Sequence, residues 1–250
     1  MALKRKAYER FEFWKRNKSK QALLVTGARQ VGKTYLVREL MQSHYPNSVE
    51  INLADDAAAR RSFEAATDAD DLMLRISVAA DAHLVPHETA IFLDEIQECP
   101  NVMEHIKLLV DRGEYDFILS GSLLGVKLEG ADSLPGGYLT QVEMFPLDFE
   151  EFCWAIGVRK TTLESIRESC RSVTPIDQYV HDAMMTNFRT YLVVGGMPEV
   201  VQRFLDTKGD LAAVRAVQHE LNRQYRHDIS QYAGNRALQV QEIFDQLPTQ

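Results

Sequence analysis

The sequence is short of several features that would place it in other protein classes. No apolar run approaches the roughly 18 residues that a membrane-spanning helix needs, and the first residues lack the apolar core of a signal peptide. The three cysteines are widely spaced and form no Cys-x-x-Cys pair, so neither a disulfide framework nor a zinc site is indicated. The histidines show no metal-ligand spacing, and no Ser-His-Asp arrangement is apparent. We therefore expect a cytoplasmic protein with free thiols and no membrane partner.

What is present is ordinary for a globular protein, with 250 residues of which 45% are hydrophobic and 26% are charged. The net charge of −8 is unevenly spread, because residues 1–20 carry eight Lys or Arg against two Glu. This basic segment suits either nucleic acid, whose phosphates Lys and Arg neutralise, or a solvated helix face whose Leu3, Phe11 and Trp14 pack on the core. The acidic remainder of the chain would repel a polyanion, which favours the second interpretation.

One motif dominates the chain, an uninterrupted phosphate loop of the pattern Gly-x4-Gly-Lys-Thr. Its residues are Gly27, Ala28, Arg29, Gln30, Val31, Gly32, Lys33 and Thr34. An apolar, strand-like run precedes the loop and a helical pattern follows it, which is the context that a nucleotide site requires. The two glycines let the backbone approach phosphates, and successive amide N–H groups surround the anion. Lys33 adds a full charge on the β- and γ-phosphates, and the Thr34 hydroxyl can ligate Mg²⁺.

Up to about Phe145 the chain alternates strand-like and helical segments, which predicts an α/β fold with a parallel sheet and helices on both sides. Strands are expected over residues 21–26, 48–53, 89–93, 115–120 and 138–145. Helices are expected over residues 1–18, 35–44 and 101–112, with two short ones within 55–80. A loop rich in Gly, Ser and Leu is expected over residues 121–137.

After Phe145 the pattern is helical, with no convincing strand. Helices are expected over residues 147–156, 160–171, 177–194, 197–206 and 210–227. We therefore expect three parts: a basic N-terminal helix over residues 1–20, a P-loop α/β core over 21–146 and a helical subdomain over 147–250.

A second acidic motif completes the expected site. The apolar run 89–93 ends in Asp94 and Glu95, and in a parallel sheet this motif and the phosphate loop emerge together at the carboxyl ends of strands. Asp94 is then placed to hold Mg²⁺, mostly through water. Glu95 can orient and deprotonate a water in line with the γ-phosphate, so we expect it to be catalytic together with Lys33. Such a pair suits hydrolysis, and the alternative is a solvated acidic strand end.

Other candidate residues have equally plain structural interpretations. Ser120 and Ser122 close the strand expected beside Asp94. One of them contacts the γ-phosphate, or the serines only form a turn. Gln97 either relays γ-phosphate occupancy or lies at the surface. Transition-state charge on the γ-phosphate normally calls for a further cation. Arg29 lies inside the loop, and more distant candidates are Arg112, Arg203, Arg223 and Arg226.

With these motifs the chain resembles the ATPases of the AAA+ superfamily. The general resemblance rests on the phosphate loop, on residues 92–97 (Phe-Leu-Asp-Glu-Ile-Gln) and on residues 119–122 (Leu-Ser-Gly-Ser). More specific segments are residues 145–152, 191–199 and 225–232. In these the chain is similar to predicted ATPases of bacteria and archaea in which the core precedes a C-terminal domain of unknown function.

The resemblance implies an ATP-binding core, a helical lid subdomain, and roles for Lys33, Thr34, Asp94 and Glu95. The choice of ATP over GTP rests on it. Many relatives carry an Arg in the stretch corresponding to residues 136–138, and this chain has none there, which leaves the arginine supplied by a neighbouring subunit unidentified. The chain also stops where relatives continue, so we expect a piece of a longer protein.

Three functions are consistent with this sequence. The leading hypothesis is a Mg²⁺-dependent ATPase that couples nucleotide state to the helical lid and to a missing C-terminal domain. The alternatives are a slowly hydrolysing, nucleotide-gated regulatory switch and an ATP-driven DNA-handling protein, the latter suggested by the basic N-terminus. A homo-oligomer, a protein partner and a nucleic acid partner all stay open. A small-molecule kinase is less favoured, because residues 121–250 show no second acceptor motif.

Overall fold

The computed structural model describes residues 3–18, 20–121, 137–233 and 236–246. The chain divides into two compact units, Ala2–Pro146 and Leu147–Gln250, and each is described by itself. Ser122 and nearly all of the loop expected over residues 121–137 lie outside the described residues.

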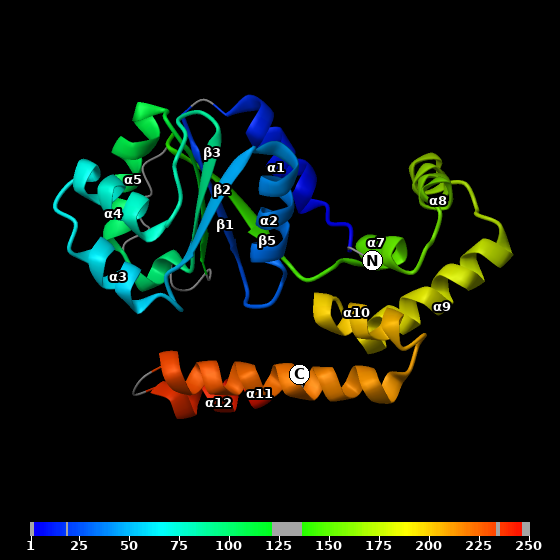
Figure 1. Ribbon diagram of the computed structural model, residues 1–250. Coiled ribbons are helices and arrows are strands. Elements are labelled where there is room, and N and C mark those ends of the chain that lie inside the picture. Colours follow the sequence, from blue (N-terminus) through cyan, green and yellow to red (C-terminus); the bar gives the residue numbers. More distant parts are fainter. Residues whose placement is uncertain (1–2, 19, 122–136, 234–235, 247–250) are drawn as a thin grey trace. The chain divides into compact units, whose positions relative to one another are not determined.

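The first unit is built around a five-stranded parallel sheet in the order β2-β3-β4-β1-β5 (Figure 1). The strands are β1 (Ala22–Gly27), β2 (Asn47–Asn52), β3 (Thr89–Asp94), β4 (Asp116–Gly121) and β5 (Leu139–Met144). This sheet confirms the predicted fold class. Leu119 of β4 pairs with Leu93 on one side and Leu24 on the other, so the carboxyl ends of β3, β4 and β1 are neighbours at one edge.

Helices cover both faces of the sheet (Figure 1). On one face lie α3 (Ala57–Glu64), α4 (Ala69–Ala79) and α5 (Asn101–Arg112), and on the other lie α1 (Ala7–Asn17) and α2 (Lys33–His44). Successive strand side chains alternate between the faces, so Leu24, Ile91 and Leu119 join the core beneath α3, α4 and α5. Burial on both faces explains why these strands appear as continuous apolar runs in the sequence.

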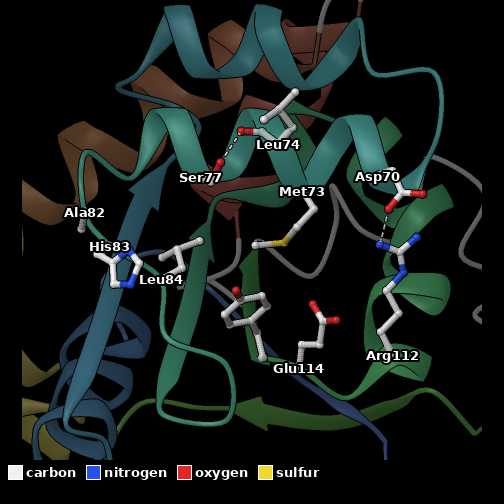
Figure 2. A pocket seen from close by; sticks show the side chains of 10 residues that line it. Asp70, Met73, Leu74, Ser77, Ala82, His83, Leu84, Arg112 and Glu114 are labelled. Atoms are coloured by element: carbon white, nitrogen blue, oxygen red, sulfur yellow. Dashed lines mark hydrogen bonds and ion pairs between the residues drawn. The ribbon is translucent and has the colours of Figure 1, made fainter.

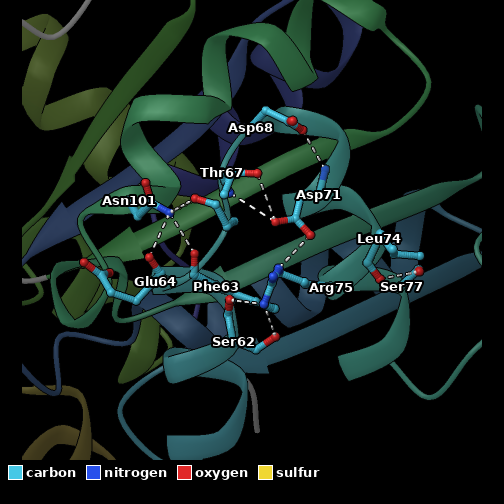
Figure 3. Close-up of polar contacts among 11 residues, drawn as sticks. Ser62, Phe63, Glu64, Thr67, Asp68, Asp71, Leu74, Arg75, Ser77 and Asn101 are labelled. Carbon is cyan, nitrogen blue, oxygen red and sulfur yellow. Dashed lines mark hydrogen bonds and ion pairs between the residues drawn. The ribbon is translucent and has the colours of Figure 1, made fainter.

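Polar side chains join the three helices of the first face to one another (Figure 3). Arg75 of α4 pairs with Asp71 at 2.8 Å and donates to the Ser62 carbonyl oxygen of α3 at 2.9 Å. Asn101, the first residue of α5, donates through Nδ2 to the Phe63 carbonyl oxygen at 2.8 Å. These contacts satisfy carbonyl groups at the carboxyl end of α3, which have no partner within the helix itself.

The basic N-terminal segment is part of the first unit. Its helix begins at Ala7, later than the predicted start, because residues 3–6 precede the first helical turn and Arg5 reaches the phosphate loop through its side chain. Phe11 and Trp14 are buried. Four cations of the segment donate to oxygen atoms of the same unit. Arg10 donates to the Gln141 carbonyl at 3.2 Å and Lys20 to the Asp111 carbonyl at 2.8 Å, and Lys15 and Lys18 donate to the Asp116 carboxylate.

Asp116, the first residue of β4, is the main anchor of α1. Its carboxylate accepts from Lys15 Nζ at 3.1 Å, from Lys18 Nζ and from the Tyr45 hydroxyl at 2.6 Å. Two ammonium groups therefore share one negative charge. Burial, with Lys15 close by, lowers the pKa of Lys18 to about 8.

We expect Asp116→Asn to destabilise the chain by about 2 kcal/mol, because it leaves two partly buried cations without a counter-charge. Urea unfolding measures the change. Asp70→Asn is the matched control, since Asp70 forms an exposed ion pair with Arg112, and exposed ion pairs contribute little to stability. Equal stability of the two variants would contradict the anchoring role.

The second unit is helical. It contains α7 (Phe149–Ala155), α8 (Lys160–Ser172), α9 (Gln178–Val194), α10 (Pro198–Asp206), α11 (Leu211–Tyr232) and α12 (Ala237–Gln246). The sequence prediction ended α11 too early and missed α12. No Gly or Pro interrupts residues 228–232, and Arg226 of α11 pairs with Asp245 of α12 at 2.8 Å, which holds the two helices together.

Two of the more specific sequence segments, residues 145–152 and 191–199, meet inside this unit. The Leu147 N–H donates to the Gly196 carbonyl oxygen at 2.6 Å, and the Tyr191 hydroxyl donates to the Leu147 carbonyl oxygen at 2.8 Å. The Tyr191 ring also packs against Phe149 and Phe152. A Cβ on Gly196 would lie 2.1 Å from the Leu147 carbonyl oxygen, so only glycine fits there.

The three cysteines are free. Within the described ranges, no helix is long and apolar enough to cross a membrane.

Candidate functional site

The phosphate loop connects β1 to α2 at the carboxyl edge of the sheet. Gly27 has φ of 147° and Gly32 has φ of 94°, values that side chains disfavour. A Cβ on Gly27 would lie 2.3 Å from the Met144 carbonyl oxygen of β5, so glycine is also required by space. Gln30 adopts a left-handed conformation as well, with φ of 65°. The loop is therefore tightly wound against the end of β5.

Lys33 is the first residue of α2, and its side chain turns back over the loop. The residue is 5% exposed, and Nζ donates to the carbonyl oxygens of Gly27 at 3.1 Å and Ala28 at 3.0 Å. Burial lowers the pKa of Lys33, while the nearby carboxylates of Glu95 and Asp94 raise it and Arg29 lowers it. The ammonium group is thus a buried cation close to both acidic residues.

Asp94, the last residue of β3, is the centre of the polar cluster. Its Oδ2 accepts from the Thr34 hydroxyl at 2.8 Å. Its Oδ1 accepts from the Ser120 hydroxyl and from the Glu95 N–H, the latter at 3.0 Å. The structure therefore brings together side chains that follow β1, end β3 and lie within β4, three strands that are neighbours in the sheet.

The oxygen atoms of this cluster fit a hard divalent cation such as Mg²⁺, which prefers a hydroxyl or one or two carboxylates together with waters and phosphate oxygens. Among the described residues, no group of three His, Cys, Asp or Glu side chains could hold a metal ion. A cation bound by Thr34 and Asp94 would therefore need nucleotide oxygens and water to complete its shell.

Glu95 stands beside this cluster in a strained backbone conformation. Its φ of 56° lies in the left-handed region, which costs a residue other than glycine of order 1 kcal/mol or more. The side chain is held in place by Gln97, whose Nε2 donates to Glu95 Oε2 at 2.5 Å. A carboxylate only accepts hydrogen bonds, so the amide must present its nitrogen. Gln97 thus contacts Glu95 directly.

Ser120 is fully buried within β4, one residue before the strand ends, so the interpretation as a turn residue is wrong. Arg29 lies close enough to Lys33 to affect its pKa. Arg223 and Arg226 belong to the helical unit, where they pair with Glu220 and Asp245.

Sequence reasoning missed one contact to the loop. Arg5, treated only as part of the basic N-terminus, donates through Nη1 to the Val31 carbonyl oxygen at 2.7 Å. It also donates through Nη2 to the Phe145 carbonyl oxygen at the end of β5. Nothing in the spacing of residues 5 and 31 signals this contact.

A separate cavity of about 640 Å³ lies on the same unit, at the amino ends of β3 and β4 (Figure 2). Met73 and Leu84 contribute apolar lining, and Asp70, Glu114 and Arg112 contribute charge. Figure 2 shows Asp70 and Arg112 joined at one side of the cavity. The phosphate loop is at the opposite edge of the sheet, so Arg112 lies away from the loop of its own chain.

Comparison with solved structures gives three likenesses of low identity. C. elegans PCH-2 is 15% identical with a TM-score of 0.46, over 86% of this chain and 65% of that one. Hsp104 in a closed state with ATPγS and FITC casein is 15% identical with a TM-score of 0.45, over 83% and 37%. Aeropyrum pernix ORC1 in complex with DNA is 13% identical with a TM-score of 0.40, over 75% and 66%. The chain thus spans less than two thirds of the PCH-2 and Hsp104 chains.

No curated protein matches the chain significantly. Two family models do match. One, described as a domain of unknown function (DUF8612), covers residues 185–250 within the helical unit. The other, described as an AAA domain, covers residues 19–153, which is more than half of the chain and includes the phosphate loop, Asp94, Glu95 and Ser120. The chain therefore belongs to the AAA domain family, as its resemblance to the AAA+ superfamily predicts.

Proposed function

We propose that this chain is a Mg²⁺-dependent ATPase. The AAA domain is a fold of nucleotide-binding ATPases. The observation that carries the finer proposal is the hydrogen-bonded cluster of Thr34, Asp94 and Ser120 beside the buried Lys33. Three kinds of group therefore meet at one edge of the sheet. Lys33 is a cation for phosphate, Thr34 and Asp94 offer oxygen ligands for a metal ion, and the Glu95 carboxylate is adjacent.

In this proposal the backbone amides of the phosphate loop and Lys33 bind the β- and γ-phosphates. Thr34 and Asp94 would hold Mg²⁺, which when bound neutralises charge on the phosphate oxygens. Glu95, held by Gln97, orients the attacking water and accepts its proton. The Ser120 hydroxyl donates to Asp94. In this role Ser120 would transmit the loss of the γ-phosphate to Asp94, the proposed metal ligand. ATP is preferred to GTP on the strength of the family.

We also propose that residues 147–250 respond to the nucleotide, as a lid or through a protein partner or second copy. Such a response requires that ATP and its products differ in affinity for two conformations. DNA handling is less favoured, because Arg5, Arg10, Lys15 and Lys20 of the N-terminal segment donate to oxygen atoms of their own unit.

The proposal predicts phosphate release from ATP that stops when EDTA removes Mg²⁺ and returns when Mg²⁺ is added in excess. We expect Thr34→Ala to raise the Mg²⁺ concentration for half-maximal activity about tenfold, the equivalent of one lost ligand contact. Thr207→Ala is the control, since its hydroxyl donates to the Arg203 carbonyl oxygen in the helical unit. A colorimetric phosphate assay across a Mg²⁺ series measures both.

Two outcomes would redirect the proposal. Hydrolysis that persists in EDTA would contradict the proposed dependence on Mg²⁺. ATP binding with only a single slow turnover, accelerated by an added protein, would favour the regulatory switch over a steady-state ATPase.

A further inference from the structure

We propose that Arg5 is a positioning residue of the phosphate loop, which holds the Val31–Gly32 peptide so that its N–H faces the bound phosphates. The inference rests on the proposed function, because it concerns nucleotide binding at the same site. It gives one residue of the basic N-terminal segment a task that the segment's charge pattern does not indicate.

The first step is the pair of contacts that Arg5 makes. Its guanidinium donates to the Val31 carbonyl oxygen inside the loop and to the Phe145 carbonyl oxygen just after β5. A planar guanidinium presents several N–H donors in a fixed arrangement, so it suits two acceptors at once. The loop after β1 and the chain after β5 are therefore joined through one rigid side chain.

The second step is the geometry of the peptide that Arg5 holds. Val31 lies between Gln30, with φ of 65°, and Gly32, with φ of 94°. A trans peptide is planar, so its N–H points away from its C=O. Holding the Val31 carbonyl oxygen outward against Arg5 therefore directs the Gly32 N–H to the other side, into the concave face of the loop, where such loops bind anions through their amides.

The third step is the freedom of this peptide to rotate. Glycine populates positive and negative φ with similar ease, so Gly32 does not by itself fix the orientation of the peptide before it. The Val31 side chain is buried and fixes one end. A charge-assisted hydrogen bond to the carbonyl oxygen supplies the other constraint. Without Arg5 we expect the peptide to sample orientations in which the N–H no longer faces the phosphates.

The test compares Arg5→Ala, Arg5→Lys and the control Arg10→Ala in the full chain. Arg10 lies in the same basic segment but donates to the Gln141 carbonyl oxygen, away from the loop. Calorimetric titration with ADP measures affinity, and phosphate release from ATP separates kcat from KM.

We expect Arg5→Ala to weaken ADP affinity and raise the KM for ATP about tenfold, as one lost charge-assisted hydrogen bond implies. Arg5→Lys, with a single compact head group, should lie between Arg5→Ala and wild type. The kcat at saturating ATP should stay within about twofold of wild type, because the reacting groups are untouched.

A general loss of structure would give a different pattern, because a smaller active fraction lowers kcat and leaves KM unchanged. That result, or unchanged ADP affinity in both Arg5 variants, would overturn the inference. A wild-type chain that binds ADP without hydrolysing ATP would instead count against the proposed ATPase, and the ADP titrations would still test Arg5.

Discussion

We expect Lys33→Ala to abolish ATP binding at concentrations that saturate the wild-type chain. Lys33 is nearly buried, and its ammonium group lies within 3.1 Å of two carbonyl oxygens of the loop. It is the full positive charge that the loop offers to the β- and γ-phosphates. Removing one partner of a buried charge pair costs roughly 3 kcal/mol or more, so the Kd should rise at least about a hundredfold.

Calorimetric titration with ATP in excess Mg²⁺ measures this loss. Lys160→Ala is the matched control, because Lys160 is exposed on α8 and pairs with Glu164 at 3.7 Å. Urea unfolding of both variants verifies that the fold is kept. A Kd for Lys33→Ala within tenfold of wild type would show that phosphate binding does not depend on the Lys33 ammonium group.

The second large effect is expected for Glu95→Gln, which should bind ATP with near wild-type affinity and hydrolyse it about a hundredfold to ten-thousandfold more slowly. The substituted side chain has the same size, and its amide oxygen can still accept from Gln97, so the local geometry is kept. It lacks only the ability to take a proton from water. The loss should therefore appear in kcat and not in ATP affinity.

Single-turnover hydrolysis, with binding measured separately, checks this prediction. Glu98→Gln is the control, since Glu98 ends the short 3-10 helix (Ile96–Glu98) that follows Glu95 but pairs with Arg60 at 3.8 Å. Its activity should equal that of the wild type. If Glu95→Gln turns over ATP at the wild-type rate, Glu95 is not the base, and the water is activated by another group.

Together the two variants distinguish the functions considered for this chain. Loss of binding in Lys33→Ala with loss of turnover alone in Glu95→Gln supports an ATPase. A wild-type chain that already turns over as slowly as Glu95→Gln supports a nucleotide-gated switch, whose output is the partner that the ATP-bound form prefers.

Much of the fold follows from local sequence pattern. The strands from Ala22, Thr89 and Asp116 are buried along almost all of their length and mainly apolar in the middle, because helices cover both faces of the sheet. Their alternation with helices predicts the parallel sheet, and β4 lies beside β3 as expected. Element ends were less well predicted. The first helix begins only at Ala7, and α11 continues to Tyr232, because contacts with the rest of each unit decide those residues.

The candidate site divides in the same way. The glycines, Lys33 and Thr34 form a contiguous motif whose chemistry can be recognised without a structure. The contact of Ser120 with Asp94 depends on the order of the strands, and that of Gln97 with Glu95 depends on the turn after β3. The roles of these residues in catalysis stay predictions for the experiments above.

The family, the phosphate loop and the acidic pair at a strand end can be recognised from the amino-acid sequence alone, because each is encoded in neighbouring residues. The contact of Arg5 with the loop and the contact of Asp116 with the basic helix become visible in the folded structure alone. Arg5 contacts residues 26 and 140 positions away, and Asp116 contacts Lys15 across 101 positions. Such contacts arise from the packing of whole elements, and no local pattern of side chains records them.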